Sequence, residues 1–168
     1  MSLLNQYSYV IISIIVLFAS LLILRRYLAD RRIMAIAAIS LIFLSVTGLF
    51  LLRPGAGDVS DVTVAEATIQ NGKPTFLEFF SNYCAGCMAI RPVVDQIATD
   101  LGEDFNIIRV DIHTDAGRVL RDRYSFTYTP EFILFDNEGQ ELWRGHTPPF
   151  EEQISQVIAA NIVPSENP

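Results

Sequence analysis

The chain contains 168 residues, of which 51% are hydrophobic, and its mean hydropathy is +0.33. This composition is too apolar for an ordinary soluble domain, and the apolar excess lies in the first third of the sequence. Residues 53–168 contain 18 acidic and 8 basic side chains, a difference of −10 charges. Such an acidic region argues against nucleic acid as a partner and against docking on anionic lipid.

Two long stretches near the N-terminus carry no charged side chain: residues 7–24 over 18 positions and residues 33–52 over 20. Each is long enough to cross the ~30 Å hydrocarbon core of a bilayer as a helix. A core helix of a soluble protein would show a polar stripe, whereas these stretches contain only scattered Ser and Thr. A cleaved signal peptide fits poorly, because residues 1–8 lack Lys and Arg and no small-residue cleavage site follows. We therefore predict a transmembrane helical hairpin over residues 1–52.

The connector between the two stretches, RRYLADRR, holds Arg25, Arg26, Arg31 and Arg32, four of the chain's twelve basic residues. Short basic loops stay in the cytoplasm, so both termini are expected on the other side of a plasma or inner membrane. Everything after residue 52 is then extracytoplasmic, where disulfide chemistry is permitted.

Residues 53–60, RPGAGDVS, are predicted to form a linker. Because eight residues reach at most ~28 Å, this linker would hold the following domain close to the membrane. That domain is predicted over residues 61–163, and the polar tail at 164–168 is expected to be disordered.

Within the domain, helical spacing with start and stop residues predicts helices, and runs of apolar and β-branched residues predict strands. The expected helices cover residues 61–71, 84–101, 115–124 and 149–162, and the expected strands cover 75–81, 105–112, 131–135 and 140–144. The polar helix at 115–124 is expected to be exposed, and the turn DNEG at 136–139 is typical of an antiparallel hairpin. This order predicts an α/β fold, a central mixed sheet flanked by helices on both faces.

The chain has two cysteines, Cys84 and Cys87, separated by Ala85 and Gly86. A structural disulfide would close a very small ring and remove little chain entropy. Zinc would need further ligands, and His113 and His146 are not in a metal-ligand spacing with the cysteines. A c-type haem site requires His directly after the second cysteine, where this sequence has Met88. A redox pair is the interpretation that the surrounding sequence favours.

Cys84 follows an apolar strand and stands where the next helix begins. Unpaired backbone N–H groups and the helix dipole at that position stabilise a thiolate and lower its pKa, so Cys84 is the expected nucleophile. Cys87 lies one turn further along, more shielded and suited to resolve a mixed disulfide by intramolecular attack.

Two further positions support redox chemistry. Glu78 lies within TFLEFFS, where it is either an outward-facing carboxylate or a buried acid with a raised pKa that exchanges a proton with Cys87; we favour the buried acid. Thr129-Pro130 directly precedes the strand EFILF. A cis bond before Pro130 would bring the chain beside the cysteines and leave backbone groups free to pair with an extended substrate.

Residues 60–163 resemble the thioredoxin family. The segment LEFFSNYCAGCMAIRPVVDQIA resembles that family's strand, active-site motif and kinked helix, with Pro92 at the kink. Thr129-Pro130 resembles its cis-proline loop, and Gly145 its glycine near the active site. The resemblance implies a thiol–disulfide oxidoreductase that acts on protein thiols and disulfides and needs no cofactor besides its own redox-active disulfide. It also implies roles for four residues: Cys84 as nucleophile, Cys87 as resolving thiol, Glu78 as proton relay and Pro130 in the substrate loop.

The sequence departs from the family pattern at several positions. Tyr83 stands where the family usually has Trp, and we expect it to contact substrate together with Thr129 and Pro130. No Lys lies in the second strand to pair with the buried acid, although Arg109 is nearby. The intervening Ala85-Gly86 lacks the His of strongly oxidising relatives, which favours a reductase or isomerase.

The predicted hairpin resembles that of tethered extracytoplasmic family members, including those that serve cytochrome c maturation. A reductant outside the cytoplasm needs electrons delivered across the membrane, so we expect a membrane-embedded thiol donor as a partner. The alternative function is a non-catalytic adaptor or copper chaperone, with Cys84 and Cys87 as soft metal ligands.

Overall fold

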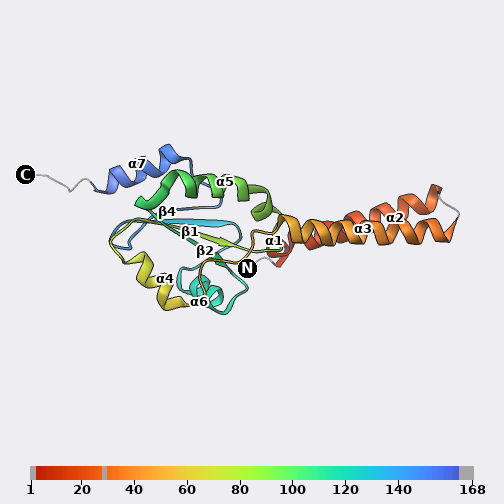
Figure 1. The fold of residues 1–168 in the computed structure, drawn as a ribbon, viewed down its shortest axis with the longest axis horizontal. Helices are drawn as coiled ribbons and strands as arrows, with labels where there is room; N and C mark the ends of the chain where they lie inside the picture. The colour runs from red at the N-terminus through yellow and green to blue at the C-terminus, as the bar shows by residue number, and fades with distance from the viewer. Residues whose placement is uncertain (1–2, 28–29, 163–168) are drawn as a thin grey trace, which may run out of the picture.

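The computed structural model describes residues 3–27 and 30–162. It has two parts joined end to end, a long helical hairpin and an α/β domain (Figure 1). The tail predicted to be disordered, residues 164–168, lies outside the described residues, as does residue 163 at the predicted end of the domain.

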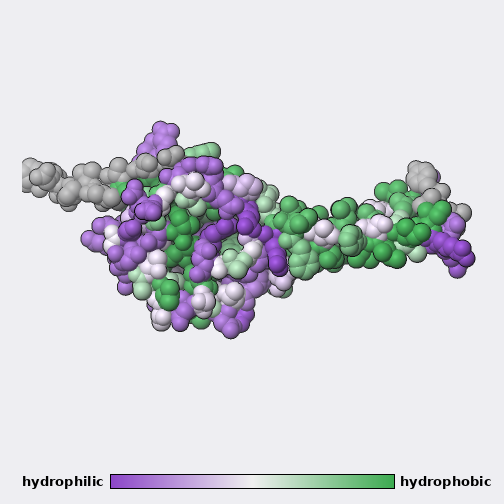
Figure 2. Space-filling model, viewed as in Figure 1, coloured by the Kyte–Doolittle hydropathy of each residue, from purple (hydrophilic) through white to green (hydrophobic). Residues whose placement is uncertain are grey.

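The hairpin consists of α2 (Ser8–Tyr27) and α3 (Arg31–Leu52), preceded by the short helix α1 (Leu3–Gln6). Both long helices are apolar enough to cross a membrane, and none of the apolar window in either is buried inside the protein. Figure 2 shows the contrast between this apolar hairpin and the largely polar surface of the domain. The connector predicted over residues 25–32 is mostly helical, because α2 continues to Tyr27 and α3 begins again at Arg31.

The domain is built on a four-stranded sheet in the order β2-β1-β3-β4. Its central strand β1 (Thr75–Phe80) is buried at every position, as expected for a Phe-rich run covered on both faces. It pairs in parallel with β2 (Asn106–Asp111) and antiparallel with β3 (Glu131–Phe135), which pairs antiparallel with β4 (Glu141–Gly145). The predicted mixed sheet is therefore confirmed.

Helices cover both faces of the sheet (Figure 1). On one face lie α4 (Val62–Ile69) and α6 (Asp115–Arg123), and on the other lie α5 (Ala85–Leu101) and α7 (Glu151–Ile162). The expectation of an exposed helix at 115–124 is wrong for its inner side, because Leu120 is fully buried in the core. A short 3₁₀ helix, Gly102–Asp104, follows α5.

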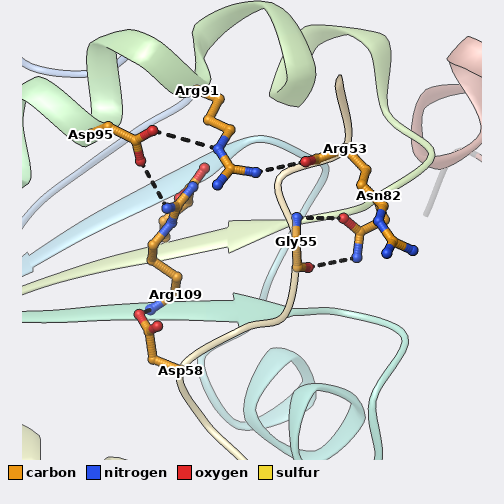
Figure 3. Close-up of polar contacts among 8 residues, drawn as sticks. Arg53, Gly55, Asp58, Asn82, Arg91, Asp95 and Arg109 are labelled. Atoms are coloured by element: carbon orange, nitrogen blue, oxygen red, sulfur yellow. Dashed lines mark hydrogen bonds and ion pairs between the residues drawn. The ribbon is translucent and has the colours of Figure 1, made fainter. Parts of the chain in front are cut away.

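The linker that follows α3 is fastened to the domain near the start of α5 (Figure 3). The Asn82 side chain accepts a hydrogen bond from Gly55 N at 2.9 Å and donates one to Gly55 O at 2.8 Å. Arg91 of α5 donates from Nη1 to Arg53 O at 2.6 Å. These contacts place the end of the hairpin against the first two turns of α5.

Further along, the linker lies beside the edge strand β2. Asp58 N donates to Arg109 O at 2.8 Å, and Arg109 N donates to the Asp58 carboxylate at 3.1 Å. A side chain at Gly57 would meet Arg109 O at 2.7 Å, so the close approach of the two backbones requires glycine there. The predicted linker thus has a defined path along the domain.

Candidate active site

Cys84 lies at the junction between β1 and α5 and is the N-cap residue of α5. Its Sγ accepts a hydrogen bond from Cys87 N at 3.2 Å, so the first turn of the helix points a backbone donor at the sulfur. Both cysteines are free thiols and both are buried. The structure therefore brings the two sulfurs together in the reduced state.

The environment separates the acidities of the two thiols. A hydrogen bond from the Cys87 thiol, aided by Thr129 and by the backbone N–H groups of Cys87 and Gly86, lowers the pKa of Cys84 to about 6 against the opposing effect of burial. The same hydrogen bond to Cys84, together with burial, raises the pKa of Cys87. At neutral pH Cys84 is thus mainly a thiolate while Cys87 keeps its proton.

The loop before β3 lies against the cysteine motif, and its Thr129–Pro130 peptide bond is cis. Cys84 Sγ is 3.9 Å from Thr129 O. A methyl group built on Gly86 would lie 3.8 Å from both Cys84 Sγ and Pro130 Cδ. Thr129 and Pro130 therefore form one wall beside Cys84, where the sequence predicted that a cis bond would place the chain.

Glu78 lies in the middle of β1, and only 1% of its surface is exposed. Its Oε2 accepts a hydrogen bond from Arg109 Nε at 2.9 Å, while Oε1 is buried without a hydrogen-bond partner. Burial raises the pKa of Glu78 and the Arg109 charge opposes that rise. The Glu78 charge in turn contributes to raising the pKa of Cys87, so the two groups interact electrostatically.

Arg109 occupies the strand position beside Glu78 in the register of β1 and β2. Its guanidinium faces inward and also binds Asp95 of α5 through Nη1 at 2.9 Å (Figure 3). The sequence left the direction of this side chain open. The structure shows that Arg109 joins the buried acid, the helix that carries the cysteines and the linker.

The family model described as "Thioredoxin" matches residues 59–160, more than half of the chain. The chain belongs to the thioredoxin family. Together with the CxxC cysteines, membership makes it a thioredoxin-like thiol–disulfide oxidoreductase, an enzyme class that acts on protein thiols and disulfides and typically needs no cofactor beyond its dithiol.

Three relatives illustrate the breadth of the similarity. A thioredoxin of Mycolicibacterium smegmatis is 25% identical over 46% of this chain and 69% of its own length. Protein disulfide-isomerase erp38 of Neurospora crassa is 28% identical over 61% of this chain and 28% of its own length. The chloroplastic thioredoxin-like protein HCF164 of Arabidopsis thaliana is 25% identical over 67% of this chain and 43% of its own length.

Tyr83, where the thioredoxin family usually has Trp, is 38% exposed at the rim of the site. Its ring packs edge-on against His113, with ring centroids 5.6 Å apart. His113 Nε2 lies 2.9 Å from Ser81 Oγ, and burial lowers the pKa of His113. The sequence analysis gave His113 no role, because its proximity to the cysteines arises only when β1 and β2 pair.

His146 is a second residue that the sequence analysis left without a role. Its Nδ1 lies 2.9 Å from Pro130 O and its Nε2 lies 3.2 Å from Thr127 Oγ1. Its ring stacks on Tyr128, with centroids 3.6 Å apart. His146 thus contacts three residues of the loop before β3 in this thioredoxin-like domain. The available signal was its position directly after Gly145, which the family resemblance had placed near the site.

The N-terminal segment Asn5–Tyr9 covers this site. Asn5 Oδ1 accepts hydrogen bonds from Thr129 N at 3.0 Å and from Thr129 Oγ1 at 2.8 Å. Ser8 Oγ accepts one from Ala85 N at 3.0 Å. Only 1% of Cys84 is exposed and none of Cys87, so Cys87 is the more shielded thiol, as the sequence suggested, but Cys84 is covered almost as completely.

Within residues 3–27 and 30–162, His, Cys, Asp and Glu side chains form no group of three or more that could hold a metal ion.

Proposed function

We propose that this thioredoxin-like oxidoreductase is anchored by its helical hairpin and reduces or isomerises protein disulfides on the extracytoplasmic side of a plasma or inner membrane. The observation that carries the proposal is the pairing of a Cys84 sulfur of lowered pKa with a protonated Cys87 at the start of α5. That arrangement provides one thiol to attack and one to resolve.

In the first step the Cys84 thiolate attacks one sulfur of a substrate disulfide. The substrate S–S bond breaks, a mixed disulfide with Cys84 forms, and the other substrate sulfur leaves as a thiolate that takes a proton from solvent. In the second step Cys87 loses its proton and attacks the Cys84 sulfur. The substrate leaves as a dithiol, reduced by two electrons, and the enzyme keeps a Cys84–Cys87 disulfide.

Glu78 is proposed to accept the proton of Cys87 in the second step. Burial raises the pKa of Glu78, which suits a group that takes up and releases a proton, and its Oε1, which has no hydrogen-bond partner, is available to receive one directly or through water. The ion pair with Arg109 would keep the carboxylate form of Glu78, which must be present before this transfer, from being isolated in the core.

Substrate is proposed to lie against Tyr83, Thr129 and Pro130. Thr129 N–H faces the groove beside the nucleophile, so an extended polypeptide can accept a hydrogen bond from it as a temporary strand. The partly exposed Tyr83 ring would cover the apolar part of that substrate.

The hairpin supports the membrane placement. Both of its long helices are apolar and unburied, and the turn between them carries Arg25, Arg26, Arg31 and Arg32, which favours a cytoplasmic turn. The hairpin meets the domain at the end that contains Cys84 (Figure 1). The dithiol would thus face the membrane surface, within reach of a membrane-embedded thiol donor that re-reduces it.

The direction of electron flow is inferred from Ala85 and Gly86. Neither side chain provides a cation that would stabilise the reduced thiolate further, so a reductase or isomerase role is favoured over that of an oxidant. Maturation of c-type cytochromes is one pathway that requires such a reductant outside the cytoplasm. A reduction potential near ~−120 mV, typical of strong oxidants, would reverse this assignment.

The decisive experiment expresses Cys87→Ser in the protein's own cell. Without the resolving thiol, mixed disulfides through Cys84 should accumulate, and the captured proteins would identify substrate and donor. Cys84→Ser is the matched control and should capture nothing. Labelling of the intact cell with a membrane-impermeant thiol reagent should modify the wild-type chain. Absence of both capture and turnover of a protein disulfide would contradict the proposal and indicate an adaptor.

A further inference from the structure

The surface beside the dithiol, between Thr129–Pro130 and the first residue of α5, is the proposed substrate groove, and the protein's own N-terminus covers it. Residues Asn5–Tyr9 run across it and make hydrogen bonds to both of its walls. On one wall, Thr129 N and Oγ1 both donate to the Asn5 side chain. On the other wall, Ala85 is the first residue of α5, and its backbone N–H donates to Ser8 Oγ.

The segment between these two contacts is also held by its backbone. Ser81 Oγ donates to Gln6 O at 3.0 Å, and Gln6 is only 5% exposed. Tyr9 N donates to Tyr83 O at 3.0 Å. These contacts join the segment to the loop that leads into the cysteine motif.

Tyr7 completes the cover over the rim. Its ring stacks on Tyr83, with centroids 5.5 Å apart and planes inclined by 25°, and it also lies 5.3 Å from the His113 ring. Tyr83 is the aromatic residue that the proposed function assigns to substrate. The segment therefore uses the same wall that a substrate would use.

A protein disulfide cannot approach Cys84 in this arrangement. Attack by a thiolate requires the incoming sulfur to reach bonding distance in line with the S–S bond, and only 1% of Cys84 is exposed. The donors of Thr129 and Ala85 are already satisfied by Asn5 and Ser8, so a substrate gains their hydrogen bonds only by replacing those acceptors.

We propose that Asn5–Tyr9 is an internal ligand of the substrate groove and determines which disulfides reach Cys84. Partners that gain access are polypeptides whose extended segment supplies acceptors to both Thr129 N–H and Ala85 N–H and thereby displaces the N-terminus. Small disulfides that contact neither wall are disfavoured. The identity of the groove as the substrate site rests on the proposed function; the cover over Cys84 does not.

Displacement of the segment is compatible with a domain that stays in place. The second connection to the hairpin, through Arg53, Gly55 and Asp58, is made by different residues and does not touch the dithiol. The hydrogen bonds of the N-terminal segment are individually modest in net free energy. The segment can leave the groove while the linker holds the domain.

The test compares the alkylation rate of Cys84 by iodoacetamide at pH 7 in the full-length chain and in an Asn5→Ala/Ser8→Ala variant, both in detergent micelles. Loss of the bonds to both walls should raise the rate roughly tenfold. Ser40→Ala, on the exposed surface of α3, is the matched control and should leave the rate unchanged. An equal rate in the double variant and the wild type would overturn the proposal.

Two further measurements keep the result unambiguous. Tyr7→Ala removes the stacking on Tyr83 but leaves the hydrogen bonds to Thr129 and Ala85, and it should also accelerate alkylation. If circular dichroism shows that the double variant is misfolded, Tyr7→Ala decides alone. Turnover of a protein disulfide is measured in parallel. Faster alkylation without turnover in any chain would uphold the internal ligand and contradict the proposed function. Turnover of the protein disulfide together with unchanged alkylation would uphold the proposed function and contradict the internal ligand.

Discussion

Two connections join the hairpin to the thioredoxin-like domain, and they differ in chemistry. The linker after α3 is fixed by Asn82, Arg91 and the backbone of Arg109, at positions that do not contact the cysteines. The N-terminal segment Asn5–Tyr9, which includes the first two residues of α2, is held by Asn5 and Ser8, which accept hydrogen bonds from Thr129 and Ala85 beside Cys84. The linker contacts fix the position of the domain relative to the hairpin, and the N-terminal contacts control access to the Cys84 sulfur.

The difference follows from what each connection is bonded to. The linker is bonded to the backbone of Arg109 in β2 (Figure 3), and the side chain of the same residue is paired with the buried Glu78 and with Asp95, so the linker lies on a strand that is anchored in the core. The N-terminal segment contacts neutral donors around the groove, and each such hydrogen bond contributes little net free energy. Substitutions on the linker side should therefore change stability, and those on the N-terminal side should change access to Cys84.

The largest expected effect on the linker side is that of Arg109→Ala. Removing this guanidinium leaves Glu78 as an unpaired buried charge and should lower the free energy of unfolding by about 3–5 kcal/mol. Urea denaturation of the full chain measures this. Arg118→Ala, which breaks an exposed ion pair with Asp115, is the control and should cost no more than ~1 kcal/mol. Equal costs for the two variants would show that the ion pairs of Arg109 with Glu78 and Asp95 do not stabilise the core.

Glu78→Gln, at the ion-pair partner of Arg109, tests the chemical role of this carboxylate rather than its effect on stability. The amide cannot accept the Cys87 proton, so breakdown of the mixed disulfide by Cys87 should slow by roughly 10²-fold. The rate is measured by quenching a single turnover with acid. Alkylation of Cys84 provides the internal control and should stay within about twofold, since general-base catalysis plays no part in it. Unchanged breakdown of the mixed disulfide would remove Glu78 from the mechanism.

The pH dependence of Cys84 alkylation tests the lowered pKa of the sulfur that the N-terminal segment covers. With a pKa of about 6, the thiolate fraction rises with pH, so the rate should increase about tenfold per pH unit below 6 and level off above about 7. Cys87→Ala removes the largest stabilising hydrogen bond and should move this profile to higher pH. A profile that still rises at pH 8 in the wild type would contradict the lowered pKa.

Asn82→Ala gives the smallest expected effect. It deletes the hydrogen bonds of the side chain with Gly55 and with Asp111, at a cost of about 1–2 kcal/mol in unfolding free energy. Asn137→Ala, on the exposed turn between β3 and β4, is the control and should be neutral. Cys84 alkylation should be unaffected in both variants. Acceleration in Asn82→Ala alone would show that the two connections are not independent.

Most of the fold could be predicted because its signals are local. The apolar run at β1, the spacing along α5 and the turn before β4 each depend on neighbours within a few positions, and these elements lie within a residue or two of their predicted bounds. The prediction that the helix at residues 115–124 is exposed was only partly right. Whether Leu120 of a short polar helix is covered depends on which sheet face lies beneath it.

The site was predicted in part for the same reason. Cys84 and Cys87 are three positions apart at one helix start, and Glu78 lies in the strand that leads to them, so their proximity is a matter of local geometry. The inward direction of Arg109 depends on the register of β2 against β1. His146 reaches Pro130 only because β3 and β4 pair, across 16 positions of sequence.

The sequence alone determined the elements, the thiol pair at a helix start and the apolar hairpin, because propensity, capping and hydrophobic periodicity act between residues close in the chain. The tertiary structure decided that Asn5 meets Thr129 across 124 positions and that Ser8 meets Ala85 across 77. Such contacts carry no local signal, since they depend on how the hairpin docks on the finished domain. The chemistry of the sulfur was therefore readable from its neighbours in sequence, whereas its accessibility required the folded chain.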